Sequence, residues 1–413
     1  MRPTRRARAL LATTLACVIP FALQANAEAQ TLSDQQTDSI SSTARALQKL
    51  DGEAAYTDVP VEARPLLTRL KHQLRDLVSR TLDADPSMLT DARVLNARVL
   101  AALKREGVTT GRPKDDVHTY GSVISVNVFR PGRYASLIAV TTTVSVQCGE
   151  DTSLYLFRRE GKRWRLVLAD ESNDYEKISG ARESFDFRVS PADASGDFFV
   201  VSADVNPWCT SAWQLMRYRV MRVGQDAYSP RVLRSGEEEI YLGTDLEGFR
   251  LTADASTFTL RFDSAQSLDP GRLIRPHVLK FEVSNDGAER IAPVALKPED
   301  FADEWAHMNW DEAARWGEPS KLSELKRWHD TLNPDGKGFM GSEILFVRPC
   351  GKPALAWQVG VESYIDDENR ARVPPKLYFT VAREGGVFRM RGVSDARPPE
   401  CGGPARATAG GAR

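Results

Sequence analysis

The sequence predicts an α+β protein dominated by antiparallel β structure, with an N-terminal helical region followed by a large β-meander domain. Three observations lead to this fold class. Up to residue 105, apolar residues recur with a helical period of about 3.6. From residue 117 onward they alternate with polar residues, as in half-buried strands. The alternating segments also fall into four groups, each of which reads as four short strands separated by turn residues.

The N-terminal region, residues 28–110, carries the helical period. Its helices are predicted over residues 33–50, 59–82 and 86–105. Leu70 and Leu74 belong to a leucine stripe along one face of the second helix. Asp85 fits the N-cap of the third helix, with Pro86 at its first position and Gly107 just past its end. Because a leucine stripe can also pair with another chain, assembly through these helices is an alternative role for the region.

The β domain covers residues 117–296 and 340–396 and reads as four repeat units. In each unit the third and fourth strands form a hairpin, as in the segment LFRREGKRWRLV at 156–167. The first three units begin roughly 60 residues apart, a spacing typical of repeat architectures. Like units that pack together cover one another's apolar faces and edges, so the pattern predicts a β-propeller-like array. One or two β-sandwiches are the alternative, because strand alternation and turns are common to all meanders.

A tryptophan-rich helical segment, residues 297–333, separates the third unit from the fourth. It contains half of the eight tryptophans of the chain: Trp305, Trp310, Trp316 and Trp328. Packing in a core is the predicted role of these rings. His307 and His329 could hold a metal only together with a nearby carboxylate, and histidines beside tryptophans more commonly pack and hydrogen-bond, so no metal site is predicted. The tail, residues 397–413, is rich in Gly, Ala, Pro and Arg and is predicted to be disordered.

The first 27 residues have the layout of a secretory signal peptide. Four arginines precede a mostly apolar run over 9–23, and small residues follow at 25–27. Cleavage after Ala27 is predicted, which sends the protein to a periplasm or to the exterior of the cell. Lipidation at Cys17 is the alternative, although it leaves a shorter apolar run before the cut. No later stretch has about eighteen apolar residues in a row, so no transmembrane span is predicted.

The net charge argues against two classes of partner. The whole chain has a formal charge of −1, and removal of the four signal arginines makes the mature chain more acidic. Nucleic acids and anionic membranes are bound by basic patches, so neither is a predicted partner. The sequence also lacks a recognisable nucleotide or metal motif, so no cofactor is predicted.

Four cysteines remain after the signal peptide: Cys148, Cys209, Cys350 and Cys401. An even number in an exported protein predicts two disulfides. Two of these cysteines follow the second strands of the first and second units, and the other two flank the fourth unit. The predicted pairs are therefore Cys148–Cys209 and Cys350–Cys401. Buried free thiols are the alternative.

The strongest candidate binding residues are two tryptophans, Trp208 and Trp213, on either side of Cys209. A disulfide at Cys209 would hold this loop rigid, and aromatic rings on a preorganised loop suit a glycan, peptide or protein ligand. The alternative role of the two rings is to cover the apolar end of the sheet and to shield the disulfide.

The function predicted from these features is that of an exported, non-enzymatic binding or scaffolding protein of the cell envelope or exterior. The sequence has no G-x-S-x-G nucleophile motif. The alternative is a hydrolase acting on an envelope polymer, either glycan or peptide. Two carboxylates that act together are paired in space and leave no sequence motif, so this alternative stays open.

Overall fold

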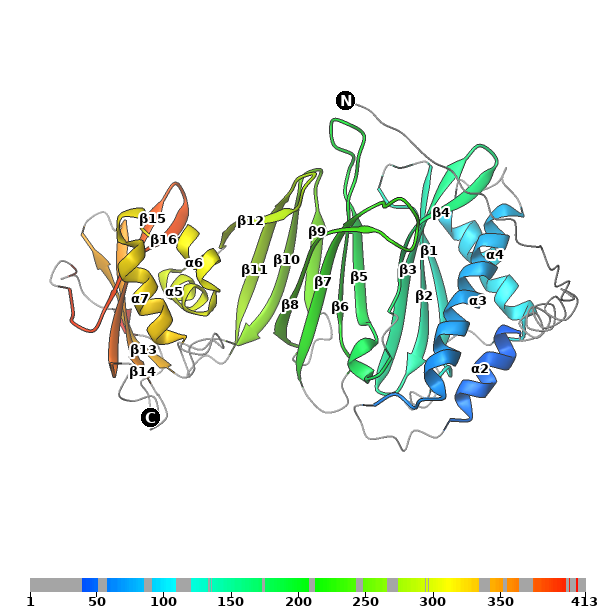
Figure 1. Cartoon of the computed structure of the whole chain (residues 1–413), viewed down its shortest axis with the longest axis horizontal. Coiled ribbons are helices and arrows are strands. Elements are labelled where there is room, and N and C mark those ends of the chain that lie inside the picture. Colours follow the sequence, from blue (N-terminus) through cyan, green and yellow to red (C-terminus); the bar gives the residue numbers. More distant parts are fainter. Residues whose placement is uncertain are drawn as a thin grey trace, which may run out of the picture.

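The computed structural model describes residues 39–50, 58–84, 91–108, 120–132, 134, 136–172, 175–207, 212–242, 248–265, 274–293, 295, 297–333, 342–351, 355–363, 374–398, 401 and 406–407. It shows an elongated row of layers (Figure 1). N-terminal helices lie at one end, three β-sheets follow, and a second group of helices with a fourth sheet lies at the other end. The predicted fold class is confirmed: the protein is α+β, with repeated antiparallel four-strand units.

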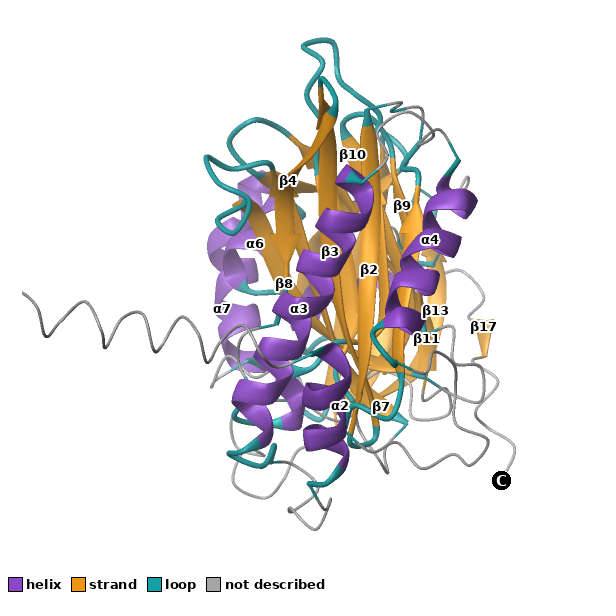
Figure 2. Cartoon of the chain, turned by 90° about the vertical axis from the view of Figure 1, so that its right-hand side faces the viewer, coloured by secondary structure: helices purple, strands orange, loops and turns teal. Residues whose placement is uncertain are grey.

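Three helices form the N-terminal layer: α2 (Ile40–Gln48), α3 (Ala63–Asp83) and α4 (Ala92–Arg105). Their leucine faces are buried in one core with the outer face of the first sheet. Figure 2 shows α3 and α4 lying in front of that sheet. The leucine stripe is therefore covered by the protein's own sheet. No helix in the described part of the chain is long and apolar enough to cross a membrane.

The start of α4 differs from the prediction. The helix begins at Ala92, where Asp91 is the N-cap and its carboxylate accepts a hydrogen bond from the Arg93 amide at 2.8 Å. The predicted cap, Asp85, and the predicted first residue, Pro86, lie outside the described residues. The sequence offers two aspartates before this helix, and local pattern alone did not decide between them.

Sixteen of the strands in the described part of the chain form four meanders in sequence order. The first sheet has β1 (Ile124–Phe129), β2 (Leu137–Val146), β3 (Gly149–Glu160) and β4 (Arg163–Asp170). The second has β5 (Glu183–Val189), β6 (Val200–Val205), β7 (Trp213–Arg222) and β8 (Arg231–Tyr241). The third has β9 (Phe249–Ala253), β10 (Thr257–Ala265), β11 (Ile274–Val283) and β12 (Ala288–Pro293). The fourth has β13 (Ser342–Cys350), β14 (Ala356–Ser363), β15 (Lys376–Glu384) and β16 (Val387–Ser394).

The first three sheets stack face to face. Side chains alternate along each strand, so each sheet contributes its two faces to different cores. Every residue of β2 is buried, because helices cover one face of the first sheet and the second sheet covers the other. The second sheet lies in the same way between the first and the third. The row does not close into a ring: the first and fourth sheets lie at opposite ends (Figure 1).

Helices α5 (Pro298–His307), α6 (Trp310–Arg315) and α7 (Leu322–Leu332) pack on one face of the fourth sheet. Trp305 and Trp316 are buried there, so the predicted core role of these rings is confirmed. His307 and His329 each have a ring nitrogen hydrogen-bonded to a main-chain carbonyl, at 2.7 and 2.8 Å. Within the described ranges, no three His, Cys, Asp or Glu side chains are grouped so as to hold a metal ion.

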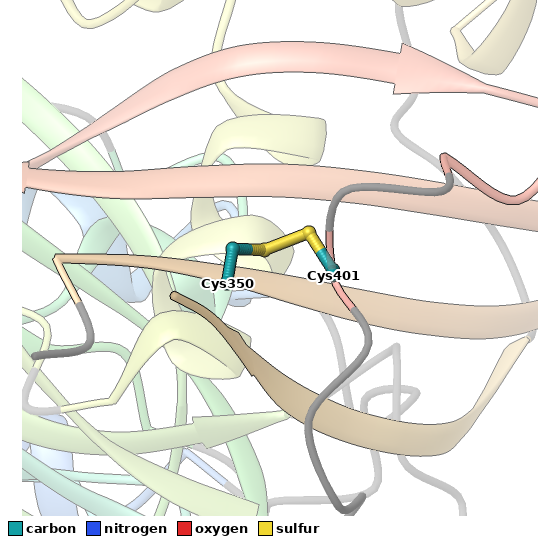
Figure 3. The surroundings of a disulfide bond; sticks show 2 residues. All are labelled: Cys350 and Cys401. Atoms are coloured by element: carbon teal, nitrogen blue, oxygen red, sulfur yellow. A yellow bond between two sulfur atoms is a disulfide. The ribbon is translucent and has the colours of Figure 1, made fainter. Parts of the chain in front are cut away.

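Cys350, at the end of β13, is joined to Cys401 by a disulfide that spans 51 residues (Figure 3). Cys401 is buried, and a short strand, β17 (Arg406–Ala407), pairs with β13. The predicted disorder of the tail is therefore wrong for these residues, because the disulfide ties the chain to the edge of the fourth sheet.

Cys148 is also disulfide-bonded, and it occupies the β2–β3 turn with a positive φ of 64°. Its predicted partner, Cys209, lies outside the described residues. Pro207, two residues before Cys209, comes so close to the turn that a Cβ on Gly149 would lie 3.1 Å from it. Pro207 of the second sheet therefore lies beside the turn that contains Cys148.

Candidate functional site

Two clefts open next to the start of β5, where the second sheet meets the first. The first, which we call the Arg182 cleft, has a volume of about 580 Å³ and is lined by charged residues of the β4–β5 connection and of β6–β8. The second, which we call the aromatic groove, has a volume of about 490 Å³ and lies between β1–β3 and β5. Both volumes fall in the range of small-ligand sites.

Arg182 ties the first two sheets together beneath the Arg182 cleft. Its Nη2 donates to Asp170 Oδ2 at 2.9 Å, and its Nε donates to Asp204 Oδ2 at 3.1 Å. Asp170 is the last residue of β4, and Asp204 lies near the end of β6. Both carboxylates and the guanidinium are almost completely buried. A buried ion pair of this kind is stable only when its geometry and hydrogen bonding are good, as they are here.

The arginines hold the buried Asp170 carboxylate in its charged form. Burial by itself would raise the pKa of Asp170, but Arg182, Arg219 and a hydrogen bond from Ser202 bring that pKa below its usual value. Burial would lower the pKa of Arg182, and the carboxylates of Asp170 and Asp204 raise it instead. Asp170 and Arg182 are therefore both charged near neutral pH.

Arg217 completes the cluster by fixing the chain between β4 and β5. Its Nε donates to Asp204 Oδ1 at 2.9 Å. Its two terminal nitrogens donate to the carbonyl oxygens of Ser179 and Ala181, at 2.8 and 2.7 Å. The Arg182 cleft is thus built on a rigid, charge-compensated framework that sets the position from which β5 begins.

A second buried cluster ties α3 to the same place. Lys71 Nζ donates to Asp151 Oδ2 at 3.0 Å, and the hydroxyl of Tyr175 also binds this carboxylate. The other oxygen of Asp151 accepts the Arg182 amide at 3.1 Å. Burial and the nearby Asp151 carboxylate raise the pKa of Tyr175 well above its usual value, so the phenol stays protonated and donates. The sequence feature that could have indicated this cluster is Lys71, a charged residue within the apolar face of α3.

The floor of the aromatic groove is a patch of polar side chains on one face of the first sheet. Asn127 on β1 lies opposite Thr141 on β2, and Thr143 lies opposite Thr152 on β3. The hydroxyls of Thr143 and Thr152 are hydrogen-bonded to each other at 2.9 Å. Because residues two apart on a strand share a face, these amide and hydroxyl groups form one continuous surface.

Phenyl rings form the wall of the groove. Phe185 and Phe187 extend from β5, and Phe129 lies at the end of β1. The rings of Phe129 and Phe187 meet edge to face with their centroids 5.6 Å apart, and those of Phe185 and Phe187 are 6.3 Å apart. Phe129 is 43% exposed, and its ring contacts the ring of Phe187. The groove therefore presents aromatic surface directly to solvent.

The Arg182 cluster preorganises this wall. The guanidinium of Arg182 lies 4.5 Å from the centroid of the Phe185 ring, and the Arg182 carbonyl accepts the Thr152 amide at 3.0 Å. Ser184, between these residues, has a φ of 47°. A non-glycine residue in this left-handed region costs roughly 1–2 kcal/mol and is found where the surroundings enforce it, commonly at binding sites. The fixed ends of this segment provide that enforcement.

Of the two residues predicted as ligand-binding, the structure describes one, Trp213, and it lies outside both clefts. Trp213 starts β7, is half-buried, and packs against Tyr241 with the ring centroids 5.0 Å apart. It is not among the residues that line the Arg182 cleft or the aromatic groove. Trp208 lies outside the described residues. Sequence reasoning missed the phenylalanines of the groove, although the alternation of Phe185 and Phe187 with charged residues on an edge strand was a usable signal.

Comparisons with known proteins give little further guidance. No family model matches the chain, and no curated protein matches it. Among solved structures, an α-L-arabinofuranosidase from Fusarium graminearum in complex with an iminosugar inhibitor is 6% identical to this chain, with a TM-score of 0.23. The match covers 69% of this chain and 66% of the arabinofuranosidase chain, which is just under two thirds of its length. A protein solved as an RGII complex is 8% identical with a TM-score of 0.22 and is matched over 71% of this chain and 91% of its own length. At such TM-scores neither likeness supports an argument about fold or function.

Proposed function

We propose that this chain is an exported, non-enzymatic binding protein of the cell envelope or exterior, and that its ligand lies in the aromatic groove. The observation that carries the proposal is the combination, in one groove, of clustered phenyl rings with side-chain hydroxyl and amide groups. Rings supply apolar contact area, and a few placed polar groups fix the orientation of a ligand, which is the usual composition of a binding site.

Export is supported by two features. The N-terminal residues have the charged, apolar and small-residue order of a signal peptide. The Cys350–Cys401 disulfide and the disulfide at Cys148 suit a compartment in which disulfides persist.

A binding role rather than acid–base catalysis is supported by the electrostatics beside the groove. A general acid must retain a proton near neutral pH. The pKa of Asp170 is instead lowered by its arginine partners, and Asp204 is held in ion pairs with Arg182 and Arg217. These buried carboxylates therefore suit a framework that holds the groove in shape.

The proposal is tested with the purified, oxidised mature protein and fractions of envelope glycans, peptides and lipids. Bound and free compounds are identified by mass spectrometry. We expect the wild-type protein to retain a compound without changing it chemically, and the Phe129→Ala variant to lose this binding. The control is Ile291→Ala, which removes a similarly exposed apolar side chain (40%) on β12 and should still bind the compound. If Trp213→Ala abolished binding of the compound while Phe129→Ala still bound it, the binding site would lie at Trp213 and not in the aromatic groove.

A hydrolase is the second candidate, and one carboxyl group favours it. Burial raises the pKa of Glu238, on β8, to about 7, with a further contribution from Glu312, while Arg290 and Arg234 act in the opposite direction. A carboxyl group with a pKa raised to about 7 can hold a proton near neutral pH, as a general acid must. Consumption of an envelope compound, with new products that disappear in Glu238→Gln, would establish this function and overturn the non-enzymatic one.

A further inference from the structure

We infer that the ligand of the aromatic groove is a neutral glycan. The inference rests on the proposed function, since it names the chemical class of ligand for the same groove. Three features of the groove lead to it: the kind of polar group on its floor, the exposed ring surface of its wall, and the charge of its lining.

The floor offers side-chain groups rather than a free strand edge. Asn127 and three threonines, Thr141, Thr143 and Thr152, line this floor; the threonines are 6–7% exposed, and the hydroxyls of Thr143 and Thr152 are hydrogen-bonded to each other. Amide and hydroxyl groups can both donate and accept, which matches the mixed character of sugar hydroxyls. An extended peptide commonly binds by adding a strand to an open sheet edge. Such strand pairing is blocked at Val128 of β1, because its outward amide already donates to Asn96 Oδ1 of α4 at 3.1 Å.

The phenyl rings of the wall offer a surface on which the apolar face of a sugar ring can pack. Phe129 and Phe187 meet edge to face, so the two rings present surfaces at nearly right angles, with an interplanar angle of 77°. The C–H face of a pyranose ring can pack on one phenyl surface while its hydroxyl rim reaches the threonine floor. Phe129 and Phe187 are already ordered by contact with each other, so little conformational entropy is lost when a ligand binds.

The charge of the lining argues for a neutral ligand. The charged residues that line the groove are Glu150, Asp186 and Arg188. Asp186 and Arg188 form an ion pair with each other. The remaining formal charge is that of Glu150, which repels an anionic polymer and leaves no cation surplus to bind a carboxylate or sulfate.

The test is a glycan array followed by isothermal titration calorimetry on the full mature protein at about 0.15 M salt, the ionic strength at which weak surface electrostatics is screened. The probes are neutral oligomers of glucose, N-acetylglucosamine and mannose, oligomers of galacturonic acid, and extended peptides. We expect a neutral oligomer to bind, Phe129→Ala to weaken it roughly tenfold or more, and Phe129→Tyr, which keeps the ring, to retain it. Ile291→Ala serves as the matched surface control.

The outcomes separate the ligand class from the site. Preference for the uronate oligomers or for the peptides, still lost in Phe129→Ala, overturns the neutral-glycan inference and leaves the groove as the binding site. Binding of a neutral oligomer that is unchanged in Phe129→Ala overturns the groove as the site. Absence of binding to every neutral oligomer overturns the inference as well.

Discussion

Arg182 shows how one side chain can organise the meeting of two sheets. It lies between the ends of β4 and β6, and its main-chain carbonyl and amide also pair with β3. The guanidinium pairs with two buried carboxylates, Asp170 and Asp204, and shares their charge with Arg219 and Arg217.

Replacement of Arg182 by methionine is therefore expected to lower the free energy of unfolding by about 3–5 kcal/mol, because Asp170 and Asp204 lose a buried cation. Urea unfolding at pH 7 measures the change. Arg93→Met is the control, since the Arg93 side chain is 96% exposed, and it should change stability by less than about 0.5 kcal/mol. Equal effects of the two substitutions would contradict the framework role of Arg182.

Glu238 makes stability depend on pH in a defined direction. Its pKa is about 7 in the folded protein and 4.5 when unperturbed. Between these values the unfolded state has released the proton while the folded state still holds it, so stability falls as the pH rises from about 4.5 to about 7 and then levels off. The loss attributable to this group is about 3 kcal/mol.

Urea midpoints measured from pH 4.5 to 8 for the wild type and for Glu238→Gln provide the check. Glutamine cannot ionise, so the difference between the two curves should grow with pH in favour of the variant. Parallel curves would show that Glu238 titrates at its ordinary value.

At the scale of elements, β5 sets the geometry of the groove. It is an edge strand of the second sheet that leans on β3 of the first, and its register with β6 is interrupted between Glu183 and Asp186. Ser184 lies in this irregular stretch with a positive φ. The irregularity and the fixed position of Arg182 together direct Phe185 and Phe187 into the groove.

Substitutions at Ser184 should separate the cost of this backbone conformation from the chemistry of its hydroxyl. Ser184→Val is expected to destabilise the protein by roughly 1–2 kcal/mol, because a β-branched residue tolerates positive φ poorly. Ser184→Gly should be neutral or slightly stabilising, since glycine adopts this conformation without strain. Thermal unfolding of both variants compares them directly, and equal destabilisation would indicate that the hydroxyl matters instead.

At the scale of the whole molecule, the row of layers is closed at one end by α2–α4. The leucine face of α3 and the outer face of the first sheet share one core, in which Ile138, Val140 and Val144 are buried. An assembly role for this leucine stripe is thereby disfavoured, because its apolar face is already covered within the same chain.

Removal of residues 28–110 is expected to prevent the β domain from remaining soluble and monomeric, since an apolar sheet face would be exposed to water. Size-exclusion chromatography with light scattering would record aggregation or loss of the folded species. A stable, monodisperse truncated protein would contradict this interpretation and would return the helices to a separate role.

The local features of the fold were predictable from the sequence. The period of apolar residues located the sixteen strands of the four meanders and the three N-terminal helices, because side-chain periodicity follows directly from backbone geometry. For residues 297–333 it indicated one helical segment, where the structure has the separate helices α5, α6 and α7. Boundaries were less predictable: Asp85 and Asp91 offer the same capping chemistry, and tail residues such as Cys401 are ordered by a distant disulfide.

The sequence by itself determined the order of elements, the repeated four-strand units and an even number of cysteines after the proposed signal peptide, since each depends on residues close together in the chain. Only the tertiary structure decided the open row of sheets, the Arg182–Asp170–Asp204 cluster and the groove that unites Phe129 with Phe187. These depend on burial and pairing between distant segments. Such energies arise only when the sheets pack, so a local sequence pattern does not show which distant segments meet.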